Sequence, residues 1–82
     1  MSVKGVVVGY HRSLPRYAIR TDTGYVVLDV EWGTLVPQQI VSGPLDQPGP
    51  GTLKNETTGE PVEVNVEVTG ATKQAASLLL RE

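Results

Sequence analysis

The chain has 82 residues, of which 39% are hydrophobic, and a formal net charge of −2. A chain of this length supplies one small core, so we expect a single domain spanning residues 1–82. It contains no cysteine, which excludes disulfides, iron–sulfur clusters and thiolate zinc sites. His11 is the only histidine, so an imidazole-based metal site would have to be completed by carboxylates. We expect neither a metal nor a cofactor.

The N-terminal segment MSVKGVVVGY lacks the long apolar region and the cleavage site of a signal peptide. No apolar run approaches the ~20 residues that a membrane-spanning helix needs. We therefore expect a soluble, cytoplasmic protein with no membrane partner.

The first half of the chain predicts three strands. Residues 3–11 are rich in β-branched side chains, and Gly5 and Gly9 indicate the bends that small barrels need. Residues 16–20 and 25–32 flank the turn TDTG and predict a hairpin. Placing apolar residues on one face pairs Arg16 with Asp29 and Arg20 with Tyr25. The expected inner face then holds Tyr17, Ile19, Val26, Leu28, Val30 and Trp32.

The second half predicts shorter elements and one long strand. We expect a short helical turn over residues 36–39, a strand over 40–42 and a surface loop over 43–51, GPLDQPGPG. In residues 62–68 valines alternate with polar residues, which predicts a half-buried antiparallel strand. Pairing through the turn TTGE is expected to place Lys54 opposite Glu63 and Leu53 beside Val64.

Residues 72–82 leave two interpretations open. Good helix formers and a capping Thr72 favour a short C-terminal helix that covers one end of the sheet. Its apolar stripe would consist of Ala75, Ala76, Leu79 and Leu80. A final strand through residues 78–80 is the competing interpretation.

The whole pattern indicates a mainly β protein: a small five-stranded antiparallel barrel with a short C-terminal helix as the preferred interpretation of residues 72–82. The strand spacing and the apolar–glycine segments KGVVVGY and IVSGPL resemble the oligonucleotide/oligosaccharide-binding (OB) fold or an SH3-like barrel. The resemblance is to a fold and not to a specific family.

The sequence does not favour an enzyme. A catalytic serine needs a histidine and a carboxylate, and the chain supplies these groups as Ser13, His11, Asp22 and Asp29. None of the known sequence motifs around a catalytic serine is present. Glu63 and Glu67 lie on one strand face, where carboxylates keep a valine-rich strand from aggregating. We predict no catalytic residue.

Charge is distributed unevenly along the chain. Residues 1–20 contain four basic and no acidic residues, whereas residues 21–82 contain three basic and nine acidic ones. Basic and aromatic side chains together are typical of surfaces that bind single-stranded nucleic acid. The candidate binding residues are Tyr10, His11, Arg12, Arg16, Arg20 and Tyr25.

Three binding functions remain open at this point. The preferred one is a non-enzymatic module that binds single-stranded nucleic acid. The alternative is a protein-interaction or assembly module, which acts through an edge strand or as a homodimer. The third and narrower function is the binding of a small anionic metabolite at Arg12 and Arg16.

Overall fold

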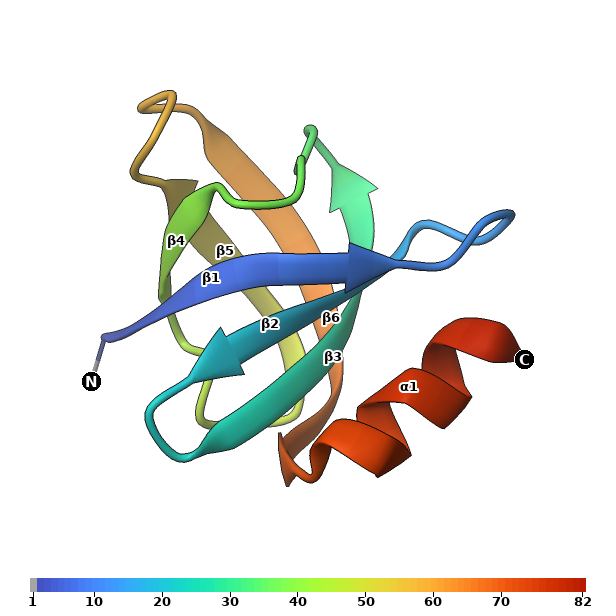
Figure 1. Cartoon of the computed structure of the whole chain (residues 1–82). Coiled ribbons are helices and arrows are strands. Elements are labelled where there is room, and N and C mark those ends of the chain that lie inside the picture. Colours follow the sequence, from blue (N-terminus) through green and yellow to red (C-terminus); the bar gives the residue numbers. More distant parts are fainter. Residues whose placement is uncertain (1) are drawn as a thin grey trace.

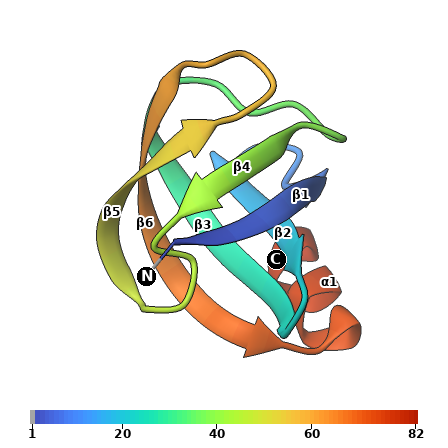
Figure 2. The same cartoon turned by 90° about the vertical axis from the view of Figure 1, so that its left-hand side faces the viewer.

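Six strands close into an antiparallel barrel in the computed structural model, which describes residues 2–82 (Figures 1 and 2). The chain forms two three-stranded meanders, and the barrel closes where β3 pairs with β6 and β1 pairs with β4. The elements are β1 (Val3–Tyr10), β2 (Arg16–Thr21), β3 (Gly24–Trp32), β4 (Ile40–Gly43), β5 (Gly49–Asn55), β6 (Pro61–Ala71) and α1 (Lys73–Arg81). This confirms a mainly β barrel with a C-terminal helix, although it has six strands rather than five.

Aliphatic side chains fill the barrel, because the chain has no phenylalanine and its tryptophan lies elsewhere. Alternate residues of each strand point inward, as a pleated strand requires. The buried cluster consists of Val7, Ile19, Val26, Leu28, Leu35, Val41, Leu45, Leu53, Val62, Val64 and Val66.

The register of the β2–β3 hairpin is confirmed throughout, from Arg16 opposite Asp29 to Arg20 opposite Tyr25. The expected register of β5 and β6 is wrong by two residues. Lys54 lies opposite Pro61 and Leu53 opposite Val62. The buried Asn55 side chain accepts hydrogen bonds from the backbone N–H groups of Thr57 and Thr58. The Asn55 N–H also donates to the Glu60 carbonyl oxygen, so the turn spans residues 56–59 rather than 57–60. A shift of two residues keeps every valine on its expected face.

Trp32 does not belong to the core, contrary to the sequence prediction. Its side chain is 60% exposed. The pairing of β3 with β6 shifts register between Val30 and Trp32, and such a bulge re-aims the side chains that follow it. The alternation that places Val30 against the core therefore ends before Trp32.

The segments around β4 also differ from expectation. Residues 36–39 form a tight turn rather than a helical one: the Gln39 N–H donates to the Val36 carbonyl oxygen over 3.1 Å, and Gln38 has a φ of 80°. Pro37 followed by a positive φ is typical of a type II turn. Residues 43–51 are not entirely a surface loop, because Leu45 is buried and β5 begins at Gly49.

Helix α1 forms as the first interpretation expected, with the Thr72 hydroxyl accepting from the Ala75 N–H over 3.1 Å. It lies against the outside of β2 and β3 rather than over an end of the barrel (Figures 1 and 2). Ala76 is buried, but Ala75, expected in the apolar stripe, is exposed. Beneath the helix lie Ala18 and Val27, which pair across the strands and are buried.

The helix thus gives this side of the barrel a second small apolar layer. In the part of the chain that the structure describes, no helix has the length and hydrophobicity to span a membrane.

Candidate functional site

His11 joins the β1–β2 loop to the end of helix α1. Its side chain is only 7% exposed. The Nδ1 atom accepts hydrogen bonds from the backbone N–H groups of Ser13 and Leu14, each over 3.0 Å. Because Nδ1 is the acceptor, the ring proton lies on Nε2, which donates to the Glu82 carbonyl oxygen. Both ring nitrogens are therefore engaged within the fold.

Arg16 has a similar structural role. Its Nε atom donates to Asp29 Oδ1 over 3.2 Å, and its Nη1 atom donates to the Leu79 carbonyl oxygen over 3.1 Å. Nη1 also lies 3.7 Å from the Glu82 carboxylate. A cation at the last carbonyl groups of a helix is favourable, because those groups have no partner within the helix. His11 and Arg16 together fasten the end of α1 to the barrel.

The other four candidate residues lie closer to solvent. Tyr10 is 58% exposed, and its ring centroid is 6.4 Å from that of Tyr17. Arg12 and Arg20 are exposed and Tyr25 is half-buried. The structure therefore separates the six predicted residues into a structural pair and four surface residues.

A groove of about 260 Å³ runs between α1 and the barrel. Arg20 and Tyr25, which are neighbours across β2 and β3, lie on its barrel side, and Lys73 lies on its helix side. None of the groove-lining residues is acidic; they are Val8, Gly9, Ala18, Arg20, Tyr25, Lys73, Ala76, Ser77 and Leu80. Lys73 is not among the residues predicted from the sequence, because its position depends on which face of the barrel the helix covers.

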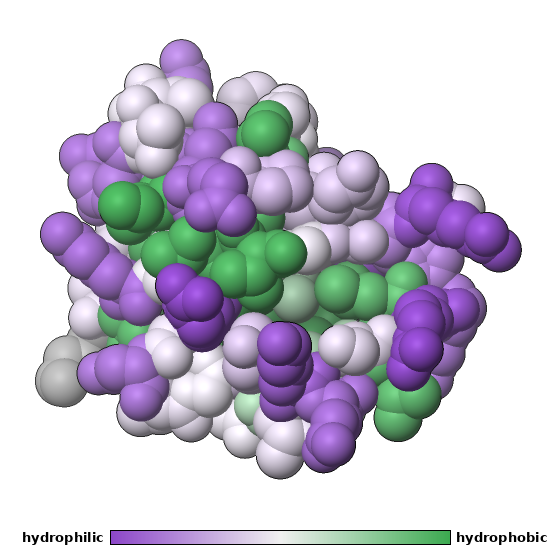
Figure 3. All heavy atoms as spheres, in the orientation of Figure 1, coloured by the Kyte–Doolittle hydropathy of each residue, from purple (hydrophilic) through white to green (hydrophobic). Residues whose placement is uncertain are grey.

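The outer face of β1 and β4 beside this groove is apolar. Val6 and Ile40 pair across the two strands, and Ile40 is exposed. Figure 3 shows apolar side chains gathered over β1 and β4, with hydrophilic ones around them. Lys4 and Arg20 border this patch, together with the acidic Asp22 of the β2–β3 turn.

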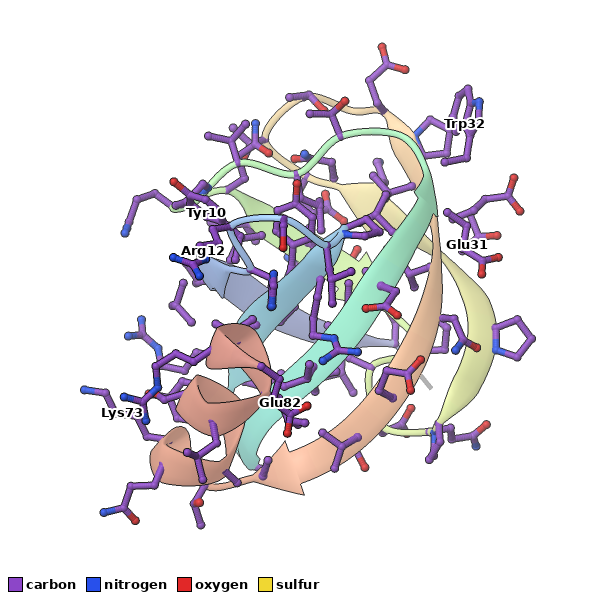
Figure 4. The ribbon with its side chains drawn as sticks, turned by 90° about the vertical axis from the view of Figure 1, so that its right-hand side faces the viewer. Tyr10, Arg12, Glu31, Trp32, Lys73 and Glu82 are labelled. Carbon is purple, nitrogen blue, oxygen red and sulfur yellow. The ribbon has the colours of Figure 1, made fainter. Side chains whose placement is uncertain are left out.

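The opposite side of the molecule presents acidic side chains and Trp32 instead of basic ones. In Figure 4, Tyr10, Arg12 and Lys73 point to one side, whereas Glu31 and Trp32 point to the other. Beyond them, exposed acidic side chains follow β6 at Glu63 and Glu67. The uneven charge of the sequence thus corresponds to two different surfaces.

Among the described residues, Glu56 alone has a clear pKa shift. The Ser42 hydroxyl donates to Glu56 Oε2 over 2.5 Å, and this hydrogen bond lowers the pKa of Glu56, helped by the nearby Lys54 and Lys4. The Glu56 side chain is exposed. Its carboxylate and its backbone N–H both bond to β4, at Ser42 and Ile40, so the shift belongs to the contact between β4 and the turn after β5.

The described residues contain no group of three or more side chains suited to hold a metal ion. Ser13 lies beside His11, but its Oγ–Nδ1 distance is 3.3 Å and Nδ1 already accepts two backbone hydrogen bonds. Comparison with family models, curated proteins and solved structures finds no match to this chain, so its candidate site is defined by geometry alone.

Proposed function

We propose that this protein is a non-enzymatic binding module that holds single-stranded nucleic acid along the groove between α1 and the barrel. The observation that carries the proposal is the meeting of Arg20, Tyr25 and Lys73 in a groove lined by no acidic residue. Proteins that bind single strands combine an aromatic face, on which a base stacks, with cations that follow the phosphates. This groove offers both.

The surface continues beyond the groove. Tyr10 and Arg12 lie on the same side of the molecule as Lys73 (Figure 4) and extend the combination of aromatic and basic groups. Lys4 lies farther along β1, on the same strand face as the apolar Val6. His11 and Arg16 take no part, because the helix end occupies their hydrogen-bonding groups.

The small number of cations limits the affinity and sets its salt dependence. Lys4, Arg12, Arg20 and Lys73 can neutralise at most four phosphates. For single strands, the slope of log K against log salt is about −0.7 per neutralised phosphate, which gives a slope of roughly −2 to −3. Binding should therefore weaken by about two to three orders of magnitude over a tenfold rise in salt.

The test is a backbone amide NMR titration with a short mixed-sequence single strand at low salt, repeated at high salt. We expect shifts at Val8, Gly9 and Ser77, which line the groove, and we expect them to vanish at high salt. The double variant Arg20→Gln, Lys73→Gln should lose binding. Lys54→Gln, an exposed cation on β5, is the matched control and should bind as the parent does. A double variant that binds like the parent would exclude the groove.

A second candidate is homodimerisation, which the apolar pair of the half-buried Val6 and the exposed Ile40 favours. Each of the six strands has a hydrogen-bonded neighbour on both sides, so pairing between sheet edges is not available to the described strands. A dimer would instead bury the outer face of β1 and β4. The mass in solution distinguishes the two functions, and Ile40→Lys should restore a monomer if this face is buried.

A further inference from the structure

Trp32 is the only tryptophan of the chain, and the core does not use it. It lies at the end of β3, beyond the register shift, with 60% of its side chain exposed. Large exposed aromatic groups of this kind are typical of binding surfaces, because their burial against a partner contributes more than that of most side chains. The position of Trp32 thus needs an explanation other than packing.

A groove of about 390 Å³ lies beside the indole, lined by Trp32, Gly33, Thr34, Gln39, Thr58, Glu60 and Pro61. Hydrogen bonds and close backbone packing fix the residues that line the groove. Gln39 Oε1 accepts hydrogen bonds from the Val36 N–H and from Asn55 Nδ2. A Cβ atom on Gly33 would lie 3.2 Å from the Pro61 carbonyl oxygen, so the two chain segments meet closely. The groove is formed before any ligand arrives.

Three carboxylates surround this groove. Glu60 lines it, Glu31 precedes Trp32 in the chain, and Glu63 lies opposite Trp32 on β6. All three are exposed. Among the described residues both ion pairs involve Arg16, so none of these carboxylates has an ion-pair partner. The nearest cation by register, Lys54 opposite Pro61, lies close enough to Glu56 to lower the pKa of that carboxyl.

We propose that this surface, the Trp32 groove, binds a basic segment of a protein partner. An arginine or lysine side chain of the partner lies over the face of the indole, and Glu31, Glu60 and Glu63 balance its charge. Cations are attracted to the negative face of an aromatic ring, and tryptophan provides the strongest such attraction. Arginine fits best, because its planar guanidinium stacks on the ring while its N–H groups donate to carboxylates.

The charge of the surface decides between possible occupants. Three carboxylates repel the phosphates of a nucleic acid, so this groove is not an extension of the groove beside α1. A neutral sugar would stack on the indole but would draw no benefit from three negative charges. The proposal is independent of nucleic-acid binding, since Trp32 points away from Tyr10, Arg12 and Lys73 (Figure 4).

The experiment uses the intrinsic fluorescence of the protein, which Trp32 alone supplies as a tryptophan signal. The probe is a short acetylated and amidated peptide of glycine, serine and arginine. In the matched peptide, citrulline, the neutral isostere of arginine, replaces each arginine. We expect a saturable fluorescence change with the arginine peptide that weakens with salt, and at least a fivefold weaker response to the citrulline peptide.

Variants then locate the site. Glu60→Gln and Glu63→Gln should each weaken peptide binding, and together they should weaken it roughly tenfold. Glu67→Gln changes the same charge on the same strand farther from the groove and should leave binding unchanged. Trp32→Leu, followed by NMR shifts of Gly33 and Thr34, should reduce affinity by roughly two- to fivefold or more.

Three outcomes would overturn the proposal. The two peptides could bind equally well, the double glutamine variant could bind as the parent does, or a neutral oligosaccharide could change the fluorescence while the arginine peptide does not. The last result would assign the groove to carbohydrate. The Arg20→Gln, Lys73→Gln variant should retain peptide binding, so this proposal and the nucleic-acid proposal can fail separately.

Discussion

Arg16 on β2 donates a hydrogen bond to the Leu79 carbonyl oxygen of α1, although 63 positions of sequence separate the two residues. The same guanidinium pairs with Asp29 on β3. One side chain thus connects a strand, its neighbour and the helix that covers both. This contact explains why a basic residue on an outer strand face is only 19% exposed.

Arg16→Met should loosen the helix without opening the barrel. Methionine keeps the unbranched stem but loses the charged hydrogen bonds, which contribute roughly 1–3 kcal/mol to the free energy of unfolding. Amide hydrogen exchange should rise first in α1. Arg12→Met, at an exposed arginine in the adjoining loop, should change stability by less than about 0.5 kcal/mol. Equal effects of the two variants would contradict the structural role of Arg16.

His11→Ala should destabilise the fold by removing the acceptor of the Ser13 and Leu14 N–H groups. Two donors that lose their partner near the protein interior cost roughly 1–3 kcal/mol of unfolding free energy. His11→Asn should recover part of that loss, because asparagine accepts from backbone N–H groups two or three positions ahead. Thermal unfolding followed by circular dichroism measures both. If the alanine variant is as stable as the parent, His11 does not organise this loop.

Gly5→Ala should destabilise the barrel through a clash. A Cβ atom at Gly5 would lie 2.5 Å from Ile19 Cγ2 and 2.9 Å from the Arg20 carbonyl oxygen. Forcing a methyl group into a packed interior costs roughly 1–3 kcal/mol. At Gly9 the added atom would meet only the end of Leu80, at 3.0 Å, and a leucine methyl can move. Denaturant titration should therefore find Gly9→Ala distinctly the more stable of the two.

Ser42→Ala should raise the pKa of Glu56 toward its ordinary value of 4.5, because the hydrogen bond from Ser42 is the largest cause of the lowered pKa. A carboxyl group whose pKa is lower in the folded chain stabilises the fold above the unfolded pKa. That contribution is lost as the pH falls through the folded pKa. The parent should thus lose stability on acidification below about pH 4.5, and the variant should lose less.

An NMR titration of the Glu56 carboxyl carbon measures this pKa in both proteins. Ser77→Ala, at a half-buried serine on α1, is the control and should leave the titration unchanged. A Glu56 pKa that is the same in the parent and in Ser42→Ala would show that the hydrogen bond does not set it.

The sequence predicts the β2–β3 hairpin well because only one register keeps Ile19, Val26 and Leu28 on a common face. The same rule is weaker for β5 and β6. A displacement by two residues leaves the valines of β6 facing inward, so the pattern does not distinguish the two registers. What decides between them is the Asn55 turn, whose hydrogen bonds depend on the burial of one amide.

The candidate site is less accessible to sequence reasoning than the fold. The composition correctly indicates that basic and aromatic residues gather near the N-terminus, but it does not reveal which of them the helix will occupy. His11 and Arg16 are engaged by residues more than 60 positions away, and the groove gains Lys73 from the same helix. Trp32 is turned outward by a local shift in the pairing of β3 with β6. The alternation of apolar and polar residues in the sequence does not reveal such a shift.

Burial of Ala18 and Val27 beneath α1 has a consequence for how freely this sequence can vary. At its centre the β2–β3 hairpin is enclosed on both faces, by the barrel interior and by the helix. On β5 and β6, by contrast, outward residues such as Thr52 and Glu63 are exposed. Tolerance to substitution should therefore be lowest in the hairpin and highest on the outer faces of β5 and β6. Descendants of this chain can change their surface chemistry on one side of the barrel while the other side stays nearly fixed.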